Sequence, residues 1–189
     1  MERKIAMPYT DWETPQAFFA SLDAEFHFDL DVCAEQRTAK CDTYLTREDN
    51  GLAMDWGNYT CWMNPPYGKD LGKWLRKAYE ASRYGATVVA LIPGNISEQD
   101  IWHDVILQAH EIRYIQGRLH FLRDGVASRS NHPSVIVVFR PGHNRYPCIF
   151  SIDTKGNLVS TPAGGINKGG ALGMVGGGGK PPQAGRREG

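Results

Sequence analysis

The sequence predicts an α/β fold built on a mainly parallel β-sheet, and two observations carry this prediction. Apolar runs of strand length alternate along the 189 residues with segments whose apolar residues recur at helical spacing. One run, residues 86–92, is continuous and rich in β-branched residues, as is typical of a strand buried on both faces of a parallel sheet. Ligands of such sheets bind beyond the carboxyl ends of the strands, so the residues that follow each strand are the first candidates for function.

The first half of the chain is expected to contain a helix, two strands and a second helix. Thr14 and Pro15 match an N-cap followed by a proline at the first helical position, with an apolar helix face after them. A short strand with interleaved acidic residues is expected over residues 27–32, and another over residues 60–63. Apolar residues then recur at helical spacing and predict an amphipathic helix over residues 69–82.

In the second half, the strand over residues 86–92 is followed by one helix and two more strands. Ser97 with Asp100 three residues later resembles a capping box, and the apolar face of the helix is expected to extend to Ala109. Residues 111–115 and 134–139 match strand patterns, with a polar loop between them.

Length and composition predict one folded domain with an extension at each end. The hydrophobic fraction of 41% and the charged fraction of 22% are ordinary for a globular protein of this size. The domain is expected over residues 11–150, after an N-terminal extension of residues 1–10. Residues 151–189 are expected to form a tail that is glycine-rich from residue 164 and buries too little apolar surface to fold.

Charge, apolar runs and cysteines limit the location and the partners. Lys plus Arg equals Asp plus Glu at 21 each, so no global basic field points to nucleic acid, although a local patch would suffice. No apolar run approaches the roughly 20 residues of a membrane span, and no signal-peptide core follows the first residues. A cytoplasmic protein without membrane contact is therefore expected. The four cysteines form no CxxC pair, so reduced thiols and no metal site are expected.

The stretch CWMNPPYG ends the second expected strand in a chemically unusual way. Asn64 carries an amide oxygen, while Pro65 and Pro66 lack N–H groups and keep their carbonyls. The Asn64 side-chain oxygen and the Pro65 carbonyl can accept both hydrogens of a planar amine and leave its lone pair free to react. Tyr67 offers a ring on which a flat base can stack. The alternative is a proline-rich turn after a strand.

A second candidate site follows the strand at residues 27–32. Asp31, near the carboxyl end of that strand, can accept hydrogen bonds from an amine or a hydroxyl of a ligand. The segment has no GxGxxG turn, and the first glycine of the chain is Gly51. It therefore lacks the glycine-rich loop that binds the pyrophosphate of a dinucleotide. The alternative is a surface strand with solvated acidic residues.

These motifs resemble a known family. Asn64-Pro65-Pro66-Tyr67 matches the [DNS]-P-P-[YF] motif of amino-methyltransferases that use S-adenosylmethionine, and the wider pattern resembles the phage-type DNA N-6-adenine methyltransferases, a Dam-related family. The likeness spans about residues 11–139. It is carried, in order, by WETP at 12–15, FDLDVCA at 28–34, DNGL at 49–52, DW at 55–56, NPPYG at 64–68, LIP at 91–93 and GRLHF at 117–121.

The resemblance implies a Rossmann-like methyltransferase core that transfers a methyl group from S-adenosylmethionine to the N6 amine of an adenine flipped out of double-stranded DNA. The residues it implies are Asn64, Pro65, Pro66 and Tyr67 as catalytic, and Thr14, Pro15, Asp31, Ala34 and Asp49 as cofactor-binding. The usual glycine-rich first cofactor motif is replaced by DVCAEQ at residues 31–36. Glu35, Asp49 and Asp55 therefore compete for the contacts to the ribose and the adenine of the cofactor.

A basic segment between the last two expected strands is the candidate DNA contact. On the methyltransferase interpretation, Arg118, Arg123 and Arg129 face phosphate or guanine, and Lys69, just after the NPPYG motif, also reaches phosphate. The alternative is a solvated hairpin loop.

The expected function is site-specific DNA adenine methylation in the bacterial host of a phage or prophage. NPPY also serves enzymes that methylate a glutamine amide of translation release factors, which makes a protein glutamine-N5 methyltransferase the first alternative. Those enzymes typically carry a glycine-rich cofactor motif, which this chain lacks. A catalytically inert DNA-binding module is the second alternative, although the Asn and the Tyr of the motif are intact.

Overall fold

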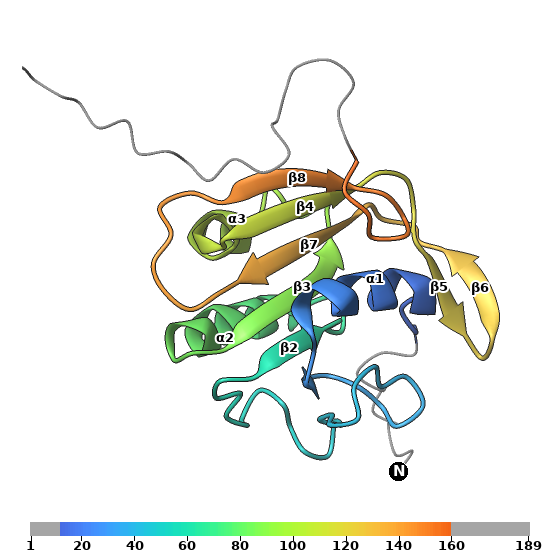
Figure 1. The fold of residues 1–189 in the computed structure, drawn as a ribbon, viewed down its shortest axis with the longest axis horizontal. Helices are drawn as coiled ribbons and strands as arrows, with labels where there is room; N and C mark the ends of the chain where they lie inside the picture. The colour runs from blue at the N-terminus through green and yellow to red at the C-terminus, as the bar shows by residue number, and fades with distance from the viewer. Residues whose placement is uncertain (1–11, 160–189) are drawn as a thin grey trace, which may run out of the picture.

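The structure is a computed structural model that describes residues 12–159, and it shows one β-sheet with helices on both faces (Figure 1). The elements are α1 (Gln16–Phe26), β1 (Leu30–Asp31), β2 (Thr60–Met63), α2 (Leu71–Arg83), β3 (Thr87–Pro93), α3 (Asp100–Asp104), the 3₁₀ turn η1 (Ile106–Gln108), β4 (Glu111–Ile115), β5 (His120–Arg123), β6 (Val126–Arg129), β7 (Ser134–Phe139) and β8 (Cys148–Ile152).

The main sheet has six strands in the order β1-β2-β3-β7-β4-β8. The pairs β1–β2, β2–β3 and β4–β8 are parallel, whereas β7 runs antiparallel to both of its neighbours, β3 and β4. Five strands therefore point the same way, and the predicted α/β fold with a mostly parallel sheet is confirmed. Strand β7 is reversed because the hairpin of β5 and β6 carries the chain out from the end of β4 and back to the same edge of the sheet.

Each face of the sheet buries its own apolar core. On one face, helix α1 packs Phe18, Phe19, Leu22 and Phe26 against the sheet, and Leu119 and Phe121 from the start of the hairpin join them. On the other face, α2 and α3 contribute Leu71, Trp74, Leu75, Ala78, Ile101 and Trp102. Strand β3 is covered on both sides, with alternate residues in the two cores, which explains its unbroken apolar sequence.

Several elements agree with the sequence prediction. Strands β2, β4 and β7 have the predicted bounds, and β3 and α2 differ from theirs by one or two residues. The predicted first strand is shorter, because only Leu30 and Asp31 pair with β2.

Three local predictions were wrong. The helix expected from Ser97 to Ala109 ends at Asp104, because Val105 leaves the helical conformation and a 3₁₀ turn follows. The N-cap of α1 is Pro15 rather than Thr14, since the Thr14 hydroxyl is engaged elsewhere. The polar loop expected between β4 and β7 is an antiparallel hairpin of β5 and β6.

At the carboxyl-terminal end, β8 extends beyond residue 150, where the sequence placed the end of the domain. Ile152 forms an isolated bridge with Leu158, and the Val159 N–H donates to the carbonyl of Ser151 at 2.9 Å. The predicted extension of residues 1–10 and the rest of the predicted tail, residues 160–189, lie outside the described residues. Within residues 12–159, no helix is long and apolar enough to cross a membrane.

Candidate active site

The carboxyl ends of the parallel strands β1, β2 and β3 meet at one edge of the sheet, and the NPPY motif lies there. Strand β1 ends at Asp31, β2 ends at Met63 directly before Asn64, and β3 ends at Pro93. Leu30 and Asp31 pair with Cys61 and Trp62, so the segments that follow β1 and β2 leave the sheet side by side. The hairpin of β5 and β6 starts and returns at this same edge (Figure 1).

The side chain of Asn64 is held by the segment that precedes α1. Asn64 is 7% exposed, and its Nδ2 donates to the Trp12 carbonyl at 3.4 Å and to the Thr14 Oγ1 at 3.3 Å. Both amide hydrogens are therefore engaged by the protein. Within residues 12–159, the Oδ1 of Asn64 accepts no hydrogen bond, so the acceptor end of the amide is open.

A second open acceptor lies next in the chain. Pro65 is buried, and no backbone N–H in the described part of the chain donates to its carbonyl. An amine that enters here meets acceptors from adjacent residues and no backbone donor from either proline. The motif therefore leaves two acceptors open on adjacent residues, and their use by an amine stays a prediction.

Tyr67 presents its ring while its hydroxyl is enclosed. The residue is 40% exposed, yet desolvation of the phenol raises the pKa of Tyr67, and the neighbouring Cys33 raises it further. An exposed side chain with a desolvated hydroxyl exposes mainly its ring. Tyr67 therefore stays neutral and offers a flat apolar surface beside Asn64.

Cys33 is the buried neighbour of this motif. Burial raises the pKa of the Cys33 thiol well above its ordinary value, Asp31 raises it further, and the backbone N–H of Asn64 lowers it. The thiol is therefore protonated near neutral pH and is not a nucleophile. Within residues 12–159, no group of three or more His, Cys, Asp and Glu side chains is placed to hold a metal ion.

Asp31 lies at the same edge and is 3% exposed. Its Oδ1 accepts the N–H of Cys33 at 3.3 Å, and its Oδ2 accepts the N–H of Lys40 at 3.1 Å. Burial raises the pKa of Asp31 to about 7, against these two hydrogen bonds and the charge of Lys40, which lower it. The carboxyl thus shapes the turn after β1 and retains lone pairs for a further donor.

The other predicted cofactor residues occupy the loops around β1. Ala34 is buried and donates its N–H to the Leu45 carbonyl at 3.0 Å. Asp49 is exposed, and its Oδ2 accepts the N–H and the hydroxyl of Thr46, both at 2.7 Å, which lowers the pKa of Asp49. Its loop packs tightly against the end of β1, since a Cβ added at Gly51 would lie 2.3 Å from the Val32 carbonyl oxygen.

The residues predicted to contact DNA lie on and beside the hairpin. Arg123 and Arg129 are exposed on β5 and β6, and the Arg123 guanidinium lies 5.7 Å from the centre of the Trp12 ring. Arg118 is half-buried, and its Nη1 has no hydrogen-bond partner within residues 12–159. Lys69 is exposed two residues after Tyr67. Arg123 and Arg129 thus lie on the hairpin that starts at the edge carrying the NPPY motif, Arg118 lies just before the hairpin, and Lys69 follows the motif in the chain.

Two contributors to the site were missed by the sequence. One is the backbone carbonyl of Trp12, which has no sequence signature. The other is Lys40, whose Nζ is almost enclosed and bonds the Glu13 Oε1 at 2.9 Å and the Gln16 Oε1 at 3.1 Å. Lys40 thereby fixes the segment that accepts from Asn64.

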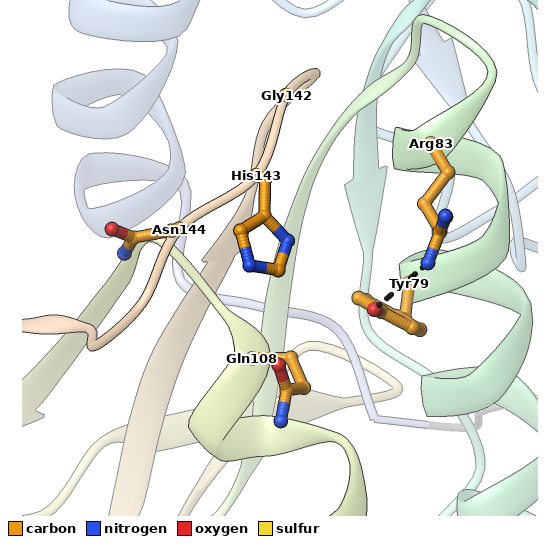
Figure 2. Close-up of a pocket in the computed structure, with 6 residues that line it drawn as sticks. All are labelled: Tyr79, Arg83, Gln108, Gly142, His143 and Asn144. Carbon is orange, nitrogen blue, oxygen red and sulfur yellow. Dashed lines mark hydrogen bonds between the residues drawn. The ribbon is translucent and has the colours of Figure 1, made fainter.

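A pocket of about 160 Å³ lies at the opposite edge of the sheet (Figure 2). It is lined by Tyr79, Arg83, Gln108, Gly142, His143 and Asn144. These residues come from the second half of α2, from η1 and from the loop after β7, where β3 and β4 begin. The length of β3 separates this pocket from Asn64, so it is not part of the candidate site.

Comparison with known proteins yields one family and two relatives. The family model described as DNA N-6-adenine-methyltransferase (Dam) matches residues 6–163. A DNA N-6-adenine-methyltransferase of Haemophilus phage HP1 is 34% identical over 137 residues, which cover 69% of this chain and 78% of that protein. The Escherichia coli K12 protein named "Putative methyltransferase YfdM" is 38% identical over 63 residues, or 30% of this chain and 69% of that protein.

Proposed function

The chain belongs to the DNA N-6-adenine-methyltransferase (Dam) family, and we propose that Asn64 and Pro65 hold the adenine N6 amine that it methylates. The single observation that carries this proposal is the state of the Asn64 amide. Its two donors are engaged by Trp12 and Thr14, which leaves Oδ1 as an open acceptor beside the open carbonyl of Pro65.

These two acceptors explain how the amine becomes reactive. The N6 amine of adenine is planar because its lone pair is delocalised into the ring. Hydrogen bonds from its two N–H groups to Asn64 Oδ1 and the Pro65 carbonyl favour a pyramidal nitrogen and localise the lone pair. The amine would then attack the methyl group of the donor without prior removal of a proton, and the methyl–sulfur bond would break as the nitrogen–carbon bond forms. The Asn64 oxygen would stabilise the positive charge on nitrogen until the extra proton passes to solvent.

Tyr67 holds the base to which the amine belongs. A base inside a duplex cannot reach buried acceptors at the edge of a sheet, so the adenine is flipped out of double-stranded DNA. The exposed ring of Tyr67 stacks on the flipped base, and such stacking contributes about 1–3 kcal/mol per base.

The methyl donor implied by the family is S-adenosylmethionine, which supplies an electrophilic methyl group when bound. The residues at this edge fit such a cofactor. The buried Asp31 carboxyl has a raised pKa and spare lone pairs, so it gains from a cationic ammonium partner. We assign cofactor contacts to Asp31, Ala34 and Asp49 on the Rossmann-like core, with Thr14 and Pro15 bordering them.

The hairpin supplies the contact to the DNA backbone. The cations assigned to phosphate are Arg118, Arg123 and Arg129, on and just before the hairpin, with Lys69 just after the NPPYG motif, and each phosphate contact strengthens binding in a salt-dependent manner. The formal net charge of the chain is zero, so this local patch has to supply the attraction. The relative in phage HP1 supports a phage context, and we expect the enzyme to act in the cytoplasm of a bacterial host.

The test is methyl transfer from labelled S-adenosylmethionine to unmethylated duplex DNA. Asn64→Ala removes the open acceptor. We expect kcat to fall by about 100-fold or more, as for the loss of one catalytic hydrogen-bonding group. Asn58→Ala is the matched control, because Asn58 is exposed just before β2, at the opposite end of the strand.

Wild type and Asn58→Ala are expected to label DNA at similar rates, with the label in N6-methyladenine. Equal labelling by Asn64→Ala would exclude the assigned role of the acceptor. Labelling of a release factor but not of DNA would exclude DNA as the substrate.

A further inference from the structure

We propose that Thr14 and the Trp12 carbonyl are positioning groups that fix the orientation of the Asn64 side-chain amide. This inference rests on the proposed function, because it concerns how the acceptor for the N6 amine is kept pointing at the substrate. It assigns to the segment before α1 a role in catalysis besides any contact with the cofactor.

An asparagine amide has two orientations that differ by a half turn and exchange its oxygen with its NH2 group. In the observed orientation, Nδ2 donates to the Trp12 carbonyl at 3.4 Å and to the Thr14 Oγ1 at 3.3 Å. The opposite orientation would turn Oδ1 towards the Trp12 carbonyl, which can only accept. Two acceptors would then face each other in a site where Asn64 is 7% exposed, and an unmade buried hydrogen bond is costly.

The two partners contribute differently. The Trp12 carbonyl determines the orientation, because it cannot donate. The Thr14 hydroxyl can donate or accept, so it does not select an orientation by itself, but it occupies the second amide hydrogen. Thr14 is 2% exposed, so water does not readily replace its hydroxyl. Both bonds are long and neutral, so each holds the amide weakly, and the loss of either allows it to rotate more freely.

The segment that carries both partners is itself fixed from the other side. The backbone of Glu13 pairs in both directions with Leu122 of β5, at 2.8 and 2.9 Å. The Lys40 Nζ bonds the Glu13 carboxylate at 2.9 Å. In an extended segment, the polar groups of neighbouring residues point in opposite directions. The backbone of Glu13 therefore points to the hairpin, while the Trp12 carbonyl and the Thr14 hydroxyl point to Asn64.

The orientation matters because only one end of the amide suits the substrate. With Oδ1 outward, Asn64 accepts from the adenine amine. With Nδ2 outward, two donors face each other and methyl transfer stops. An amide held by one long bond rotates about its Cβ–Cγ bond and presents Oδ1 to the adenine amine only part of the time, so kcat falls to that fraction while the contacts to DNA phosphates and to the cofactor persist.

The test compares three full-length variants by steady-state methylation of duplex DNA. Thr14→Val keeps the shape and loses the hydroxyl, and Thr14→Ser restores the hydroxyl. Thr87→Val makes the same change at the start of β3, where the hydroxyl has no hydrogen bond to any residue from 12 to 159. We expect Thr14→Val to lower kcat about 10-fold, with KM for DNA and for S-adenosylmethionine within about 2-fold of wild type. Thr14→Ser should recover most of that kcat, and Thr87→Val should match wild type.

A second readout does not depend on activity. The Asn64 Nδ2 protons are identified in a ¹⁵N–¹H correlation spectrum as the side-chain amide pair that disappears in Asn64→Ala. In Thr14→Val, this pair should move upfield and exchange faster with water. In Thr14→Ser and Thr87→Val, it should stay near its wild-type position.

The outcomes separate the inference from the proposed function. An unchanged kcat or an unmoved Asn64 amide signal in folded Thr14→Val would overturn the positioning role while leaving DNA methylation intact. A raised KM for S-adenosylmethionine at constant kcat would also overturn it, because Thr14 would then act only on the cofactor. Absence of DNA methylation by wild type would refute the proposed function. The Asn64 amide signal would still show whether Thr14 holds the orientation of that amide.

Discussion

Two polar clusters of this protein, around Arg113 and around Asn64, differ in how many of their hydrogen-bonding groups have a partner. Around Arg113 on β4, the guanidinium bonds both carboxylate oxygens of Glu25 at 2.7 and 2.6 Å and a carboxylate oxygen of Glu111 at 2.8 Å. Around Asn64, the two hydrogen bonds are neutral and longer, and the Oδ1 acceptor is left open. The comparison indicates that the Arg113 cluster holds the fold together, whereas the Asn64 cluster leaves one acceptor open, as the proposed binding of the substrate amine requires.

The Arg113 cluster also has apolar support. The guanidinium lies 5.0 Å from the centre of the Phe26 ring and 5.8 Å from that of Phe150, so it joins α1, β4 and β8. Glu111 accepts in addition from Arg140 at 2.9 Å. The bonds to Arg113 lower the pKa of Glu25, so this acid stays ionised over the physiological range. Every charge of the cluster has a partner, and none is left for a ligand.

The largest expected effect on stability follows from Arg113→Ala. It leaves the half-exposed Glu25 without its hydrogen-bonded cation and the largely buried Glu111 with Arg140 alone, and we expect a loss of about 3 kcal/mol in the free energy of unfolding, as for a broken buried ion pair. Urea unfolding measures this loss. Arg145→Ala, at an exposed arginine, is the control and should change stability by less than about 0.5 kcal/mol.

The comparison also requires that folded Arg113→Ala methylates DNA at a rate close to wild type below its unfolding midpoint. If this variant kept its stability and lost activity, the two clusters would not divide stability and chemistry between them.

A smaller effect on stability is expected from the ionisation of Asp31, a residue that shares features of both clusters. Both its oxygens accept from the protein, as in the Arg113 cluster, but it lies at the edge that carries Asn64. Its pKa is about 7 in the folded protein and 3.8 for the ordinary group, so the folded state keeps a proton that the unfolded state loses. The contribution of Asp31 to stability is therefore full below about pH 4 and declines as pH rises to about 7.

The measurement is the free energy of unfolding at pH 5 and pH 6.5 for wild type and Asp31→Asn. Over this range wild type should lose about 2 kcal/mol relative to the variant, at about 1.4 kcal/mol per pH unit. Taking the difference between the two proteins cancels other titrating groups, such as His110, whose pKa is lowered by burial and by Arg140. Parallel pH profiles would show that Asp31 is ionised throughout, with its charge stabilised by the turn after β1.

The smallest expected effect concerns Tyr67, and it sharpens the view that the Asn64 region is built around an exposed surface. Tyr67→Phe keeps the ring and should retain kcat/KM within about 3-fold, whereas Tyr67→Ala should lower it about 10-fold, the equivalent of a weak stacking contribution. Tyr84→Ala, at a tyrosine that is 83% exposed near the opposite edge, is the control. A larger loss for Tyr67→Phe than for Tyr67→Ala would mean that the enclosed hydroxyl matters and the ring does not.

Local sequence patterns predicted those strands and helices that have a clear apolar pattern or end at residues that stop them. Strand β2 stops where two prolines remove backbone donors, and β3 is apolar throughout because both of its faces are covered. The strands β5 and β6 were not predicted, because every residue of β6 is exposed and its sequence lacks an apolar alternation. Strand β8 was missed for a similar reason, since only Ile152 among its residues is fully buried.

The sequence by itself determined the acceptors of the site and their neighbours, because Asn, Pro and Tyr in this order after a strand define which groups are present. Only the tertiary structure decided which of these groups remain open. The Asn64 donors are engaged by a carbonyl and a hydroxyl 52 and 50 positions away. A backbone carbonyl is the same at every residue, so its use as a partner depends on how the chain folds and leaves no mark in the sequence.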